Sequence, residues 1–519
     1  MPPSTVKLVS GPEARLRTDS LRLVFLDRLL QIFKQKTRLG SVGKMLWAVC
    51  ILLSLTTFAS TKAQTLNARI SVTSTTTARI RIDARLPSAT KTLSFRNAYA
   101  GVLGLGERIE TVEGIRDNGE RVLVPRLAPG EFQSAEEFSR FNYEVNLAAP
   151  LRPADLSHVS SLNADRGVFM MADLLPQATR SSSFTSALIS VDVPNGWSVA
   201  SNVDHQESQF STDDPENAVF LVSPALREKR KRNSATELSI ITTGQWPFSE
   251  SEATKIGGEI LAEYGRITRF QLKRNPVLML VPYPGEAGPA NWSAETRGNV
   301  VVLLLGRNAK RKSVLARLGI VLSHELFHLW VPNSLKFEGA YDWFFEGFTL
   351  YQALRMDQRL GLISFDDYLE TIAGVYGSYR SAADRDSLSL IEASERRWTT
   401  SASLVYEKGM LVAFLYDLAL KKLGGCRASF ETIYAELFQR AAAGQTSANE
   451  TIISVLNAPD GLKSFSKDYV ESAGTIDLES AVSTYGIEVQ RGGSGTRLVV
   501  AKDLTETQRS LLGCIGYRR

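Results

Sequence analysis

Apolar and polar residues alternate along the first part of the chain, from Thr65 to about Gln245. The alternation recurs in short runs that are separated by clusters of Gly, Pro, Asn and Ser. A period of two belongs to strands with one buried face, and frequent turns between such runs are typical of antiparallel sheets. The pattern therefore predicts an antiparallel, sandwich-like β domain over residues 64–247. Its clearest runs read A-R-I-S-V, A-R-I-R-I-D-A, R-V-L-V and A-L-I-S-V-D-V.

The pattern changes at the end of this domain. Ser249–Gly265 has the apolar spacing of a helix, with acidic residues in its first turns. Two apolar runs follow, Pro276–Pro282 and Asn299–Leu305, and each is short enough to be a buried strand. We then expect a helix that Ser313 caps and that ends before Pro332.

Helical spacing dominates the rest of the chain. A helix that begins near Asp342 is followed by further helical segments, and a strand-like run, G-T-R-L-V-V-A-K, stands near the carboxyl end. The predicted fold is α+β and multidomain, with a mixed domain over residues 248–425 and a helical region with a short terminal strand over 426–519. The further helices are expected at Ser401–Lys422, Ser429–Ala443 and Ser447–Asn457.

The chain carries a formal net charge of +5, but the positive excess is confined to its start. Residues 1–44 hold nine Lys or Arg and three Asp or Glu, which leaves 51 basic and 52 acidic residues elsewhere. A nearly neutral remainder gives no electrostatic case for a nucleic-acid partner. Arg227–Arg232 reads R-E-K-R-K-R between two strand-like runs, and we interpret it as a solvated hairpin tip rather than a site for an anionic partner.

An apolar, charge-free run, Met45–Ser60, follows basic residues and precedes a small-residue site that ends at Ala63. This order is typical of a secretory signal, and the run is short for a membrane span. We therefore predict that residues 1–63 are a leader with a signal peptide, and that the chain is exported to a periplasmic or extracellular compartment. Two alternatives remain: residues 45–60 are retained as a membrane anchor, or translation starts further along, near Val42.

Cys50 lies in the leader, so Cys426 and Cys514 are the cysteines of the predicted exported chain. An oxidising compartment permits one disulfide between them, but two free thiols fit the count equally well. The sequence contains no cysteine cluster of the metal-binding kind.

Two of the four histidines, His324 and His328, stand four residues apart with Glu325 between them. On a helix this spacing places both imidazoles on one face, where they can bind one metal ion beside the glutamate. In a buried helix without a metal, the same two residues would be satisfied core histidines. A catalytic zinc ion takes three protein ligands and leaves one position for water. Because no histidine follows His328, we expect the third ligand to be a carboxylate.

Glu346 is the best candidate for that carboxylate. It lies in the run W-F-F-E-G-F-T, an apolar setting in which an unpaired carboxylate is costly, although an exposed helix glutamate is the other interpretation. Glu325 would then be the general base that takes the proton of zinc-activated water and passes it to the leaving amine. Tyr406, at a helix start, is one of several tyrosines that can donate a hydrogen bond to the carbonyl oxygen as charge builds there.

Three runs stand in the order H-E-L-F-H-L-W, W-F-F-E-G-F-T-L-Y and Y-E-K-G. Together they resemble the gluzincin metallopeptidases, most of all the glycyl aminopeptidase family, although no PDZ domain of the kind common in that family fits after residue 488. The resemblance implies a thermolysin-like domain over 248–425 with one Zn2+ per chain, bound by His324, His328 and Glu346. Aminopeptidase N, a more distant relative, has its catalytic tyrosine in the same Y-E-K-G run, so the resemblance assigns Tyr406 as the oxyanion donor.

Aminopeptidases of this group also have a glycine-rich run with a glutamate, on an edge strand before the zinc helix. The equivalent run here is W-S-A-E-T-R-G, in which Ser293 and Ala294 replace the glycines. By this resemblance, Glu295 would bind the free α-amine of a peptide that pairs with the strand. A surface glutamate without a ligand is the other interpretation of Glu295.

The leading hypothesis is therefore zinc-dependent hydrolysis of peptide bonds by an aminopeptidase. An endopeptidase with the same zinc chemistry is the second hypothesis, and a non-catalytic envelope protein that keeps the fold as a binding scaffold is the third. The joint presence of ligands, base and tyrosine speaks against the scaffold, which needs none of them. A peptide or protein is the expected partner, no nucleic acid is expected, and the sequence does not determine the oligomeric state.

Overall fold

The computed structural model of the protein describes residues 64–180, 183–206, 209–233, 236–308, 310–492 and 495–518. The predicted leader, residues 1–63, lies outside these ranges, so the signal-peptide and anchor interpretations stay predictions. Within these ranges, no helix is both long enough and apolar enough to span a membrane.

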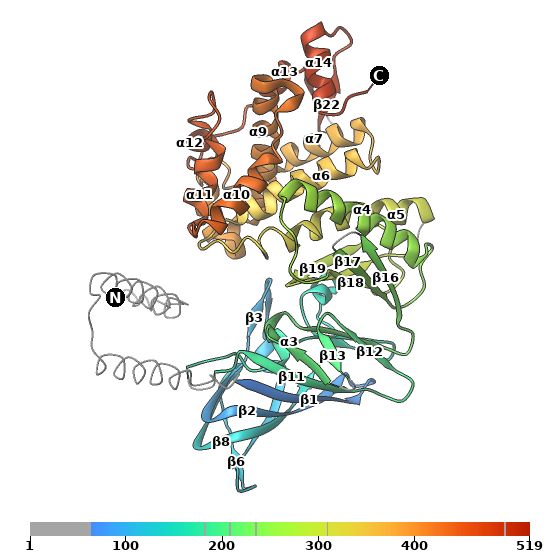
Figure 1. Ribbon diagram of the computed structural model, residues 1–519, viewed down its shortest axis with the longest axis vertical. Coiled ribbons are helices and arrows are strands. Elements are labelled where there is room, and N and C mark those ends of the chain that lie inside the picture. Colours follow the sequence, from blue (N-terminus) through green and yellow to red (C-terminus); the bar gives the residue numbers. More distant parts are fainter. Residues whose placement is uncertain are drawn as a thin grey trace, which may run out of the picture. The chain divides into compact units, whose positions relative to one another are not determined.

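The amino-terminal part of the described chain contains a large, mainly antiparallel β-sheet (Figure 1). Its strands are β1 (Thr65–Ser74), β2 (Arg79–Ser94), β5 (Ile109–Ile115), β6 (Arg121–Leu123), β7 (Arg126–Ala128), β8 (Glu131–Asn146), β11 (Ser186–Asp192), β13 (Asp204–Gln206) and β14 (Gln209–Thr212). They are ordered β13-β14-β11-β1-β2-β8-β5-β6, with β7 beside β8. Antiparallel pairing is confirmed except between β1 and β11, which run parallel because the chain crosses into a second sheet before β11.

The second sheet packs between two other sheets. Its strands are β9 (Ser161–Leu162), β10 (Gly167–Met170), β12 (Ser198–Ser201) and β15 (Val219–Ser223), ordered β12-β15-β10-β9. Phe169 and Phe220 point into the core that is shared with the first sheet. Their neighbours Val168 and Leu221 pack against the third sheet. Both faces of the second sheet are therefore buried, which explains why β10 and β15 are almost wholly apolar.

The third sheet carries the candidate site. Its strands are β16 (Arg227–Asn233), β17 (Thr236–Thr242), β18 (Val277–Pro282), β19 (Trp292–Arg297) and β20 (Val300–Leu305), ordered β16-β17-β18-β20-β19. The strands predicted at Pro276–Pro282 and Asn299–Leu305 are β18 and β20. Because β16 and β17 pair into this sheet, its first strand begins before the predicted domain boundary at residue 247.

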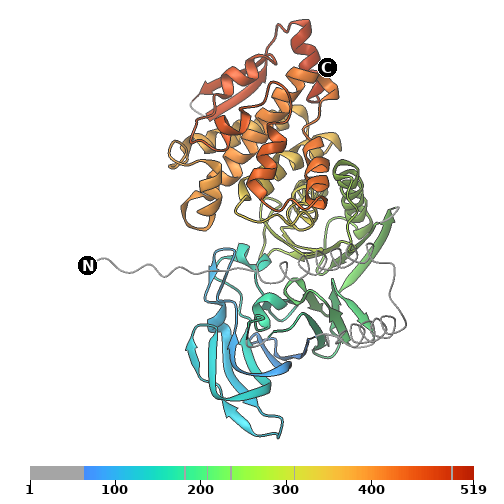
Figure 2. The same cartoon turned by 60° about the vertical axis from the view of Figure 1, so that its left-hand side comes forward.

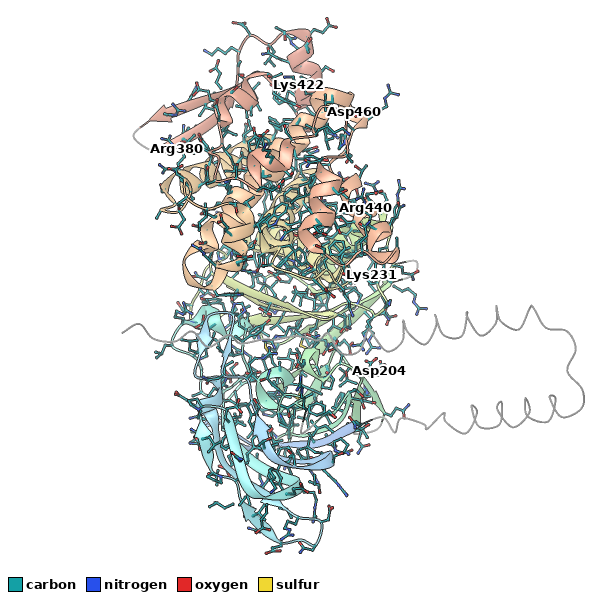
Figure 3. The ribbon with its side chains drawn as sticks, turned by 90° about the vertical axis from the view of Figure 1, so that its left-hand side faces the viewer. Asp204, Lys231, Arg380, Lys422, Arg440 and Asp460 are labelled. Atoms are coloured by element: carbon teal, nitrogen blue, oxygen red, sulfur yellow. A yellow bond between two sulfur atoms is a disulfide. The ribbon has the colours of Figure 1, made fainter. Side chains whose placement is uncertain are left out.

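The basic run Arg227–Arg232 belongs to strand β16, so the prediction of a hairpin tip is wrong. β16 pairs with β17 from Arg227↔Thr242 to Asn233↔Thr236, and no described strand pairs with its other edge. Lys231, labelled in Figure 3, is exposed on this edge strand. Charged side chains at such an edge discourage pairing with another sheet. We therefore interpret these charges as protection of an exposed sheet edge.

Two helices cover the other face of the third sheet (Figure 1). Helix α4 (Glu250–Thr268) is the helix predicted at Ser249–Gly265, and it begins at a capping box built on Ser249. Helix α5 (Arg311–Glu325) starts two residues before Ser313, so the prediction of Ser313 as its cap is wrong. A short 3-10 turn, η4 (Phe327–Leu329), follows α5 and ends before Pro332.

The rest of the described chain is mainly helical, as predicted, and Figure 2 shows its helices gathered together. The run W-F-F-E-G-F lies in a π-helical turn that continues as an α-helix, and Tyr406 lies in another π-helical turn. Helix α9 is apolar on nearly all sides and forms the centre of this region. The elements are η5 (Trp343–Phe348), α6 (Thr349–Arg359), α7 (Phe365–Ser381), α8 (Leu390–Glu395), η6 (Arg397–Ser401), η7 (Leu404–Lys408), α9 (Gly409–Gly424), η8 (Gly425–Arg427), α10 (Thr432–Ala442), α11 (Ala448–Leu456), α12 (Phe465–Tyr469), α13 (Leu478–Ser483), β21 (Ile487–Gly492), β22 (Gly495–Val500) and α14 (Glu506–Cys514).

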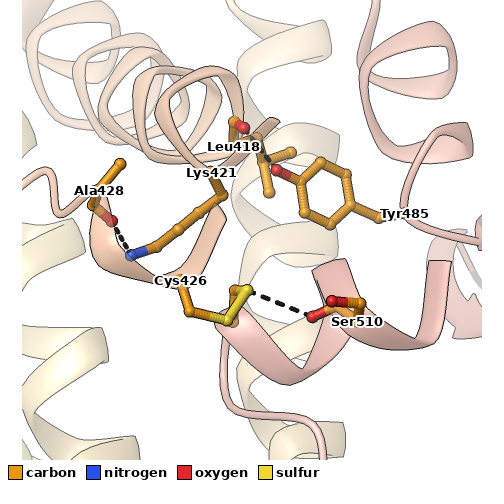
Figure 4. Close-up of a disulfide and its surroundings, with 7 residues drawn as sticks. Leu418, Lys421, Cys426, Ala428, Tyr485 and Ser510 are labelled. Carbon is orange, nitrogen blue, oxygen red and sulfur yellow. Dashed lines mark hydrogen bonds between the residues drawn. A yellow bond between two sulfur atoms is a disulfide. The ribbon is translucent and has the colours of Figure 1, made fainter. Parts of the chain in front are cut away.

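A disulfide between Cys426 and Cys514 joins the turn after α9 to helix α14 (Figure 4). Of the two possibilities that the sequence left open, the structure has the bonded pair. Nearby, the hydroxyl of Tyr485 donates a hydrogen bond to the carbonyl oxygen of Leu418, which also ties the end of the chain to α9 (Figure 4).

We expect the double substitution of Cys426→Ser and Cys514→Ser to lower the free energy of unfolding by about 4 kcal/mol, because the crosslink no longer restricts the unfolded chain. The two cysteines are 88 residues apart, so the crosslink closes a long loop. Urea unfolding of the double variant and of the oxidised wild-type protein measures the difference. Wild-type protein under reducing conditions should match the variant; equal stability with and without the crosslink would contradict this account.

Candidate active site

His324 and His328 lie about one turn apart, at the end of α5 and in the turn that follows it. His324 belongs to the last turn of α5 and His328 to η4. Their Nε2 atoms are 3.1 Å apart. Two ring nitrogens at this separation need a proton or a cation between them, because their lone pairs repel each other.

Glu346 brings a third donor atom from η5 on the next helix. Its Oε2 lies 3.5 Å from Nε2 of His324 and 3.5 Å from Nε2 of His328. The residue is only 7% exposed and follows two buried aromatic residues, Trp343 and Phe344. Burial raises the pKa of Glu346, but the two histidines and Arg397 lower it more, so the pKa lies well below its usual range. The carboxylate is therefore charged at neutral pH.

These three side chains fit a metal ion. Their ligand atoms all lie within 4.8 Å of one another. A tetrahedral zinc ion with bonds of about 2.0–2.1 Å holds its ligand atoms about 3.3 Å apart. The observed separations of 3.1, 3.5 and 3.5 Å are close to that value. Two imidazole nitrogens and one carboxylate oxygen also form a donor set typical of catalytic zinc, with a fourth position for water.

The surroundings of the two rings support the same interpretation. Nδ1 of His328 lies 2.9 Å from the carbonyl oxygen of Val331, and a hydrogen bond there leaves the Nε2 lone pair for a metal ion. Nδ1 of His324 is buried without a hydrogen-bond partner among the described residues. Burial lowers the pKa of His328, but the Glu346 carboxylate raises it more, to about 9. A metal ion would therefore have to displace a proton from this site.

Glu325 lies beside the three potential ligands and is held by the edge strand. The hydroxyl of Thr296, on β19, donates a hydrogen bond to Oε2 of Glu325 over 2.7 Å. Glu325 is buried, yet it lines the same cavity as His324 and His328. One carboxylate oxygen is thus fixed by the sheet, while the group as a whole faces the cavity.

Tyr406 lines this cavity from η7. Burial and then the Glu346 carboxylate raise the pKa of the Tyr406 phenol, while Arg397 lowers it, and the net shift is upward. The phenol therefore keeps its proton at neutral pH and can act as a hydrogen-bond donor. The structure thus brings His324, Glu325, His328, Glu346 and Tyr406 together at one cavity.

Arg397 is a residue that the sequence analysis missed. Its Nη2 donates a hydrogen bond to Oε1 of Glu346 over 2.8 Å and another to the hydroxyl oxygen of Tyr406. Its Nη1 donates to Asp342 over 2.7 Å, and its guanidinium lies 4.5 Å from the ring centre of Trp398. One planar cation thus fixes both a potential metal ligand and the phenol. The sequence offers only a weak signal, an arginine nine residues before the tyrosine.

We expect Arg397→Lys to lower kcat for peptide hydrolysis about thirtyfold with little change in KM, because an ammonium group cannot bridge two acceptors in one plane. Metal content should stay at the wild-type level, since Glu346 and both histidines remain. Steady-state kinetics and metal analysis check both statements, with Arg396→Lys at the exposed neighbouring position as the control. Unchanged kcat in Arg397→Lys would show that Arg397 does not position the phenol.

Glu295 belongs to a second polar cluster at the wall of the cavity. Its Oε2 lies 2.6 Å from Nδ1 of His158, and its Oε1 accepts a hydrogen bond from the hydroxyl of Tyr99. Nε of Arg297 is 3.7 Å from Oε1. The pleat of β19 explains the arrangement, because alternate residues face opposite sides: Glu295 faces His158 and Tyr99, while Thr296 faces Glu325. Glu295 is therefore not an isolated surface glutamate.

The cavity that holds these groups has a volume of about 720 Å³. Ala294, Glu295 and Thr296 of β19 form part of its wall, together with His324 and Glu325 of α5. In the described chain, β19 pairs with β20 alone, so its other edge has free backbone groups. An extended peptide can add to such an edge as a further strand.

Part of the chain matches a known protein family, and its fold resembles a solved structure. Residues 317–412 match the family model of the M61 glycyl aminopeptidases. No curated protein matches the sequence. Among solved structures, an aminopeptidase N family protein from Idiomarina loihiensis is similar over 85% of this chain and 82% of its own, with 17% identity and a TM-score of 0.71. An M1 zinc metallopeptidase from Deinococcus radiodurans matches over 80% of this chain and 95% of its own, with 14% identity and a TM-score of 0.48.

The family match covers the potential metal ligands, Glu325 and Tyr406, and the structural likeness covers most of the chain. The matched residues include the part of α5 that carries His324, then His328, the E-G-F-T run and Tyr406 with the start of α9. The likeness to the Idiomarina loihiensis protein shows the mixed α+β fold over most of the described residues. Residues 317–412 are therefore similar to the M61 glycyl aminopeptidases, the fold is like that of the Idiomarina loihiensis protein, and the chain is a hydrolase.

Proposed function

We propose that this protein is a zinc aminopeptidase that removes residues from the free amino terminus of peptides. The observation that carries the proposal is the convergence of three metal-ligand atoms, a buried carboxylate and a protonated phenol on one cavity beside a free strand edge. A zinc ion held by His324, His328 and Glu346 would polarise the scissile carbonyl and lower the pKa of water.

Glu325 carries the proton in this proposal. Its carboxylate accepts the proton of the attacking water and then gives it to the nitrogen of the leaving amine. Thr296 keeps one oxygen of the carboxylate in place by its hydrogen bond, so the group does not have to reorient between the two steps.

Tyr406 stabilises the charge that develops on the carbonyl oxygen. Because its oxygen accepts a hydrogen bond from Arg397, its own proton can point to the substrate. Arg397 lowers the pKa of the phenol and so partly offsets the effect of burial, because a positive charge stabilises the phenolate. A phenol with a lower pKa is a stronger hydrogen-bond donor. The donor is fixed in advance, so no reorganisation is needed when charge appears.

Glu295 would bind the α-amine of the substrate. A peptide that extends β19 as an antiparallel strand runs along Ala294 and Thr296, and the Glu295 carboxylate lies beside that path. A carboxylate has about four lone-pair sites, and the hydrogen bonds from Tyr99 and His158 use two of them. The others remain for an ammonium group, which no peptide with a blocked terminus has.

Paired peptides test the aminopeptidase proposal against the endopeptidase hypothesis. One set has free amino termini and the other carries the same sequences with acetylated termini. We expect cleavage of the first residue in the free set, and a drop of kcat/KM of about a hundredfold or more in the acetylated set. Equal cleavage of both sets would reject the amine-binding role of Glu295, and no cleavage of any peptide would favour the scaffold hypothesis.

We also propose that the chain is exported, with cleavage near Ala63. The apolar run at Met45–Ser60 supports the proposal, as does the disulfide, which is stable in an oxidising compartment. Mass spectrometry of the protein from its native cells tests it. The expected amino terminus lies near residue 64, whereas an intact Met1 in soluble material would contradict cleavage.

A further inference from the structure

A second cavity, of about 960 Å³, adjoins the catalytic one. The walls of both cavities contain Tyr99, Thr296 and Asn333. Ala294–Thr296 of β19 line the catalytic cavity, and Thr296–Asn299, which include the end of β19 and the two residues after it, line the second one. The strand that would align a peptide therefore continues from one cavity into the next.

Tyr99 stands at the junction of the two cavities, next to Glu295. Its hydroxyl donates a hydrogen bond to the Glu295 carboxylate. The guanidinium of Arg297 lies 4.1 Å from the centre of its ring, and that of Arg96 lies 5.1 Å from it. Cations over an aromatic face are attracted to it, so the ring is fixed by three contacts. The side chain cannot swing away without losing all of them.

The backbone around Tyr99 restricts it further. Tyr99 is in a short hairpin formed by β3 (Ala98–Tyr99) and β4 (Val102–Leu103), and β3 is labelled in Figure 1. The two turn residues, Ala100 and Gly101, both have positive φ angles, of 47° and 80°. Two such residues are typical of the tight type I′ turn, which fixes the geometry of a two-residue hairpin.

We propose that Tyr99 determines the specificity of the enzyme by closing the catalytic cavity just beyond Glu295. A peptide whose α-amine reaches Glu295 fits in front of the ring. A chain that continues past this point would have to enter the second cavity, and the ring blocks its path along β19. The second cavity is thus a latent subsite for residues that precede the amine position. This inference rests on the proposed aminopeptidase function.

Replacing the ring tests the inference. We compare wild-type protein with Tyr99→Ala and Tyr99→Phe on free peptides and on acetylated peptides that are two residues longer at the amino terminus. In Tyr99→Ala, the ratio of kcat/KM for the longer acetylated peptides to that for the free peptides should rise at least about tenfold, with cleavage at an internal bond. Tyr99→Phe keeps the ring but not the hydroxyl, so this ratio should stay near the wild-type value.

The outcomes separate this inference from the function on which it rests. If wild-type protein removes single residues from free peptides but Tyr99→Ala keeps the wild-type ratio, Tyr99 is not the barrier and the inference alone fails. If wild-type protein cleaves both sets equally, the aminopeptidase proposal fails, and the barrier with it. Should Tyr99→Ala not fold, Tyr99→Val provides the same comparison, because a β-branched residue suits a strand and is still shorter than the ring.

Discussion

Glu325→Gln should lower kcat for peptide hydrolysis about a thousandfold while leaving metal content unchanged. An amide has nearly the shape of the carboxylate and can still interact with Thr296, but it cannot accept a proton from water at neutral pH. His324, His328 and Glu346 are untouched, so the ion stays bound. Single-turnover kinetics and metal analysis of the variant measure the two effects separately.

A matched control for this variant is Glu436→Gln, which removes a carboxylate of α10 that does not line the catalytic cavity. Its kcat should equal that of the wild-type protein. Hydrolysis by Glu325→Gln at the wild-type rate would mean that another group takes the proton.

Tyr406→Phe should lower kcat about a hundredfold, with a smaller effect on KM, because the phenol interacts with charge that exists only in the transition state. The ring keeps its packing, and Arg397 keeps its hydrogen bonds to Glu346 and Asp342. Steady-state kinetics separate kcat from KM, and thermal unfolding checks that the fold is intact. A variant with raised KM and unchanged kcat would assign Tyr406 to substrate binding instead.

The double variant of Arg397→Lys and Tyr406→Phe tests whether Arg397 acts through the phenol. If Arg397 acts through Tyr406, the double variant should lose little more activity than Tyr406→Phe alone, because the two residues form one unit. Fully multiplicative losses would mean that Arg397 acts on its own, through Glu346 or the substrate.

The proximity of the three potential metal ligands was predictable from the sequence because it depends on short-range geometry. His324 and His328 are four residues apart, and a helix of any protein places such residues on one face. Glu346 follows on the next helix in an apolar run, and the cost of burying a carboxylate indicated that it has a partner. The role proposed for Tyr406 could be predicted only from the family resemblance, since nothing in the neighbouring sequence distinguishes it from a tyrosine that packs in the core.

Other groups of the site could not be predicted because their contacts form only in the folded chain. Tyr99 and His158 belong to the β domain and reach Glu295 across 196 and 137 positions of sequence. Arg397 contacts Glu346 across 51 positions. A pattern of apolar spacing records which face of an element is buried, but not which distant polar side chain meets it there.

The differences in the fold have similar causes. The charged residues of β16 hide its strand pattern, because neither face of that edge strand is apolar enough to show alternation. The parallel pair β1–β11 depends on where the chain crosses between sheets, which no local run reveals. At Ser313, a serine with the right chemistry for a cap lies inside a helix whose start is set by residues before it.

We propose that His324, His328 and Glu346 hold one metal ion that hydrolysis requires. Metal analysis of the purified protein, combined with peptide hydrolysis before and after removal of the ion with a chelator, tests this most directly. We expect about one zinc per chain, loss of hydrolysis when the ion is removed, and return of hydrolysis when zinc is added. Full hydrolysis by protein that contains no metal would contradict it.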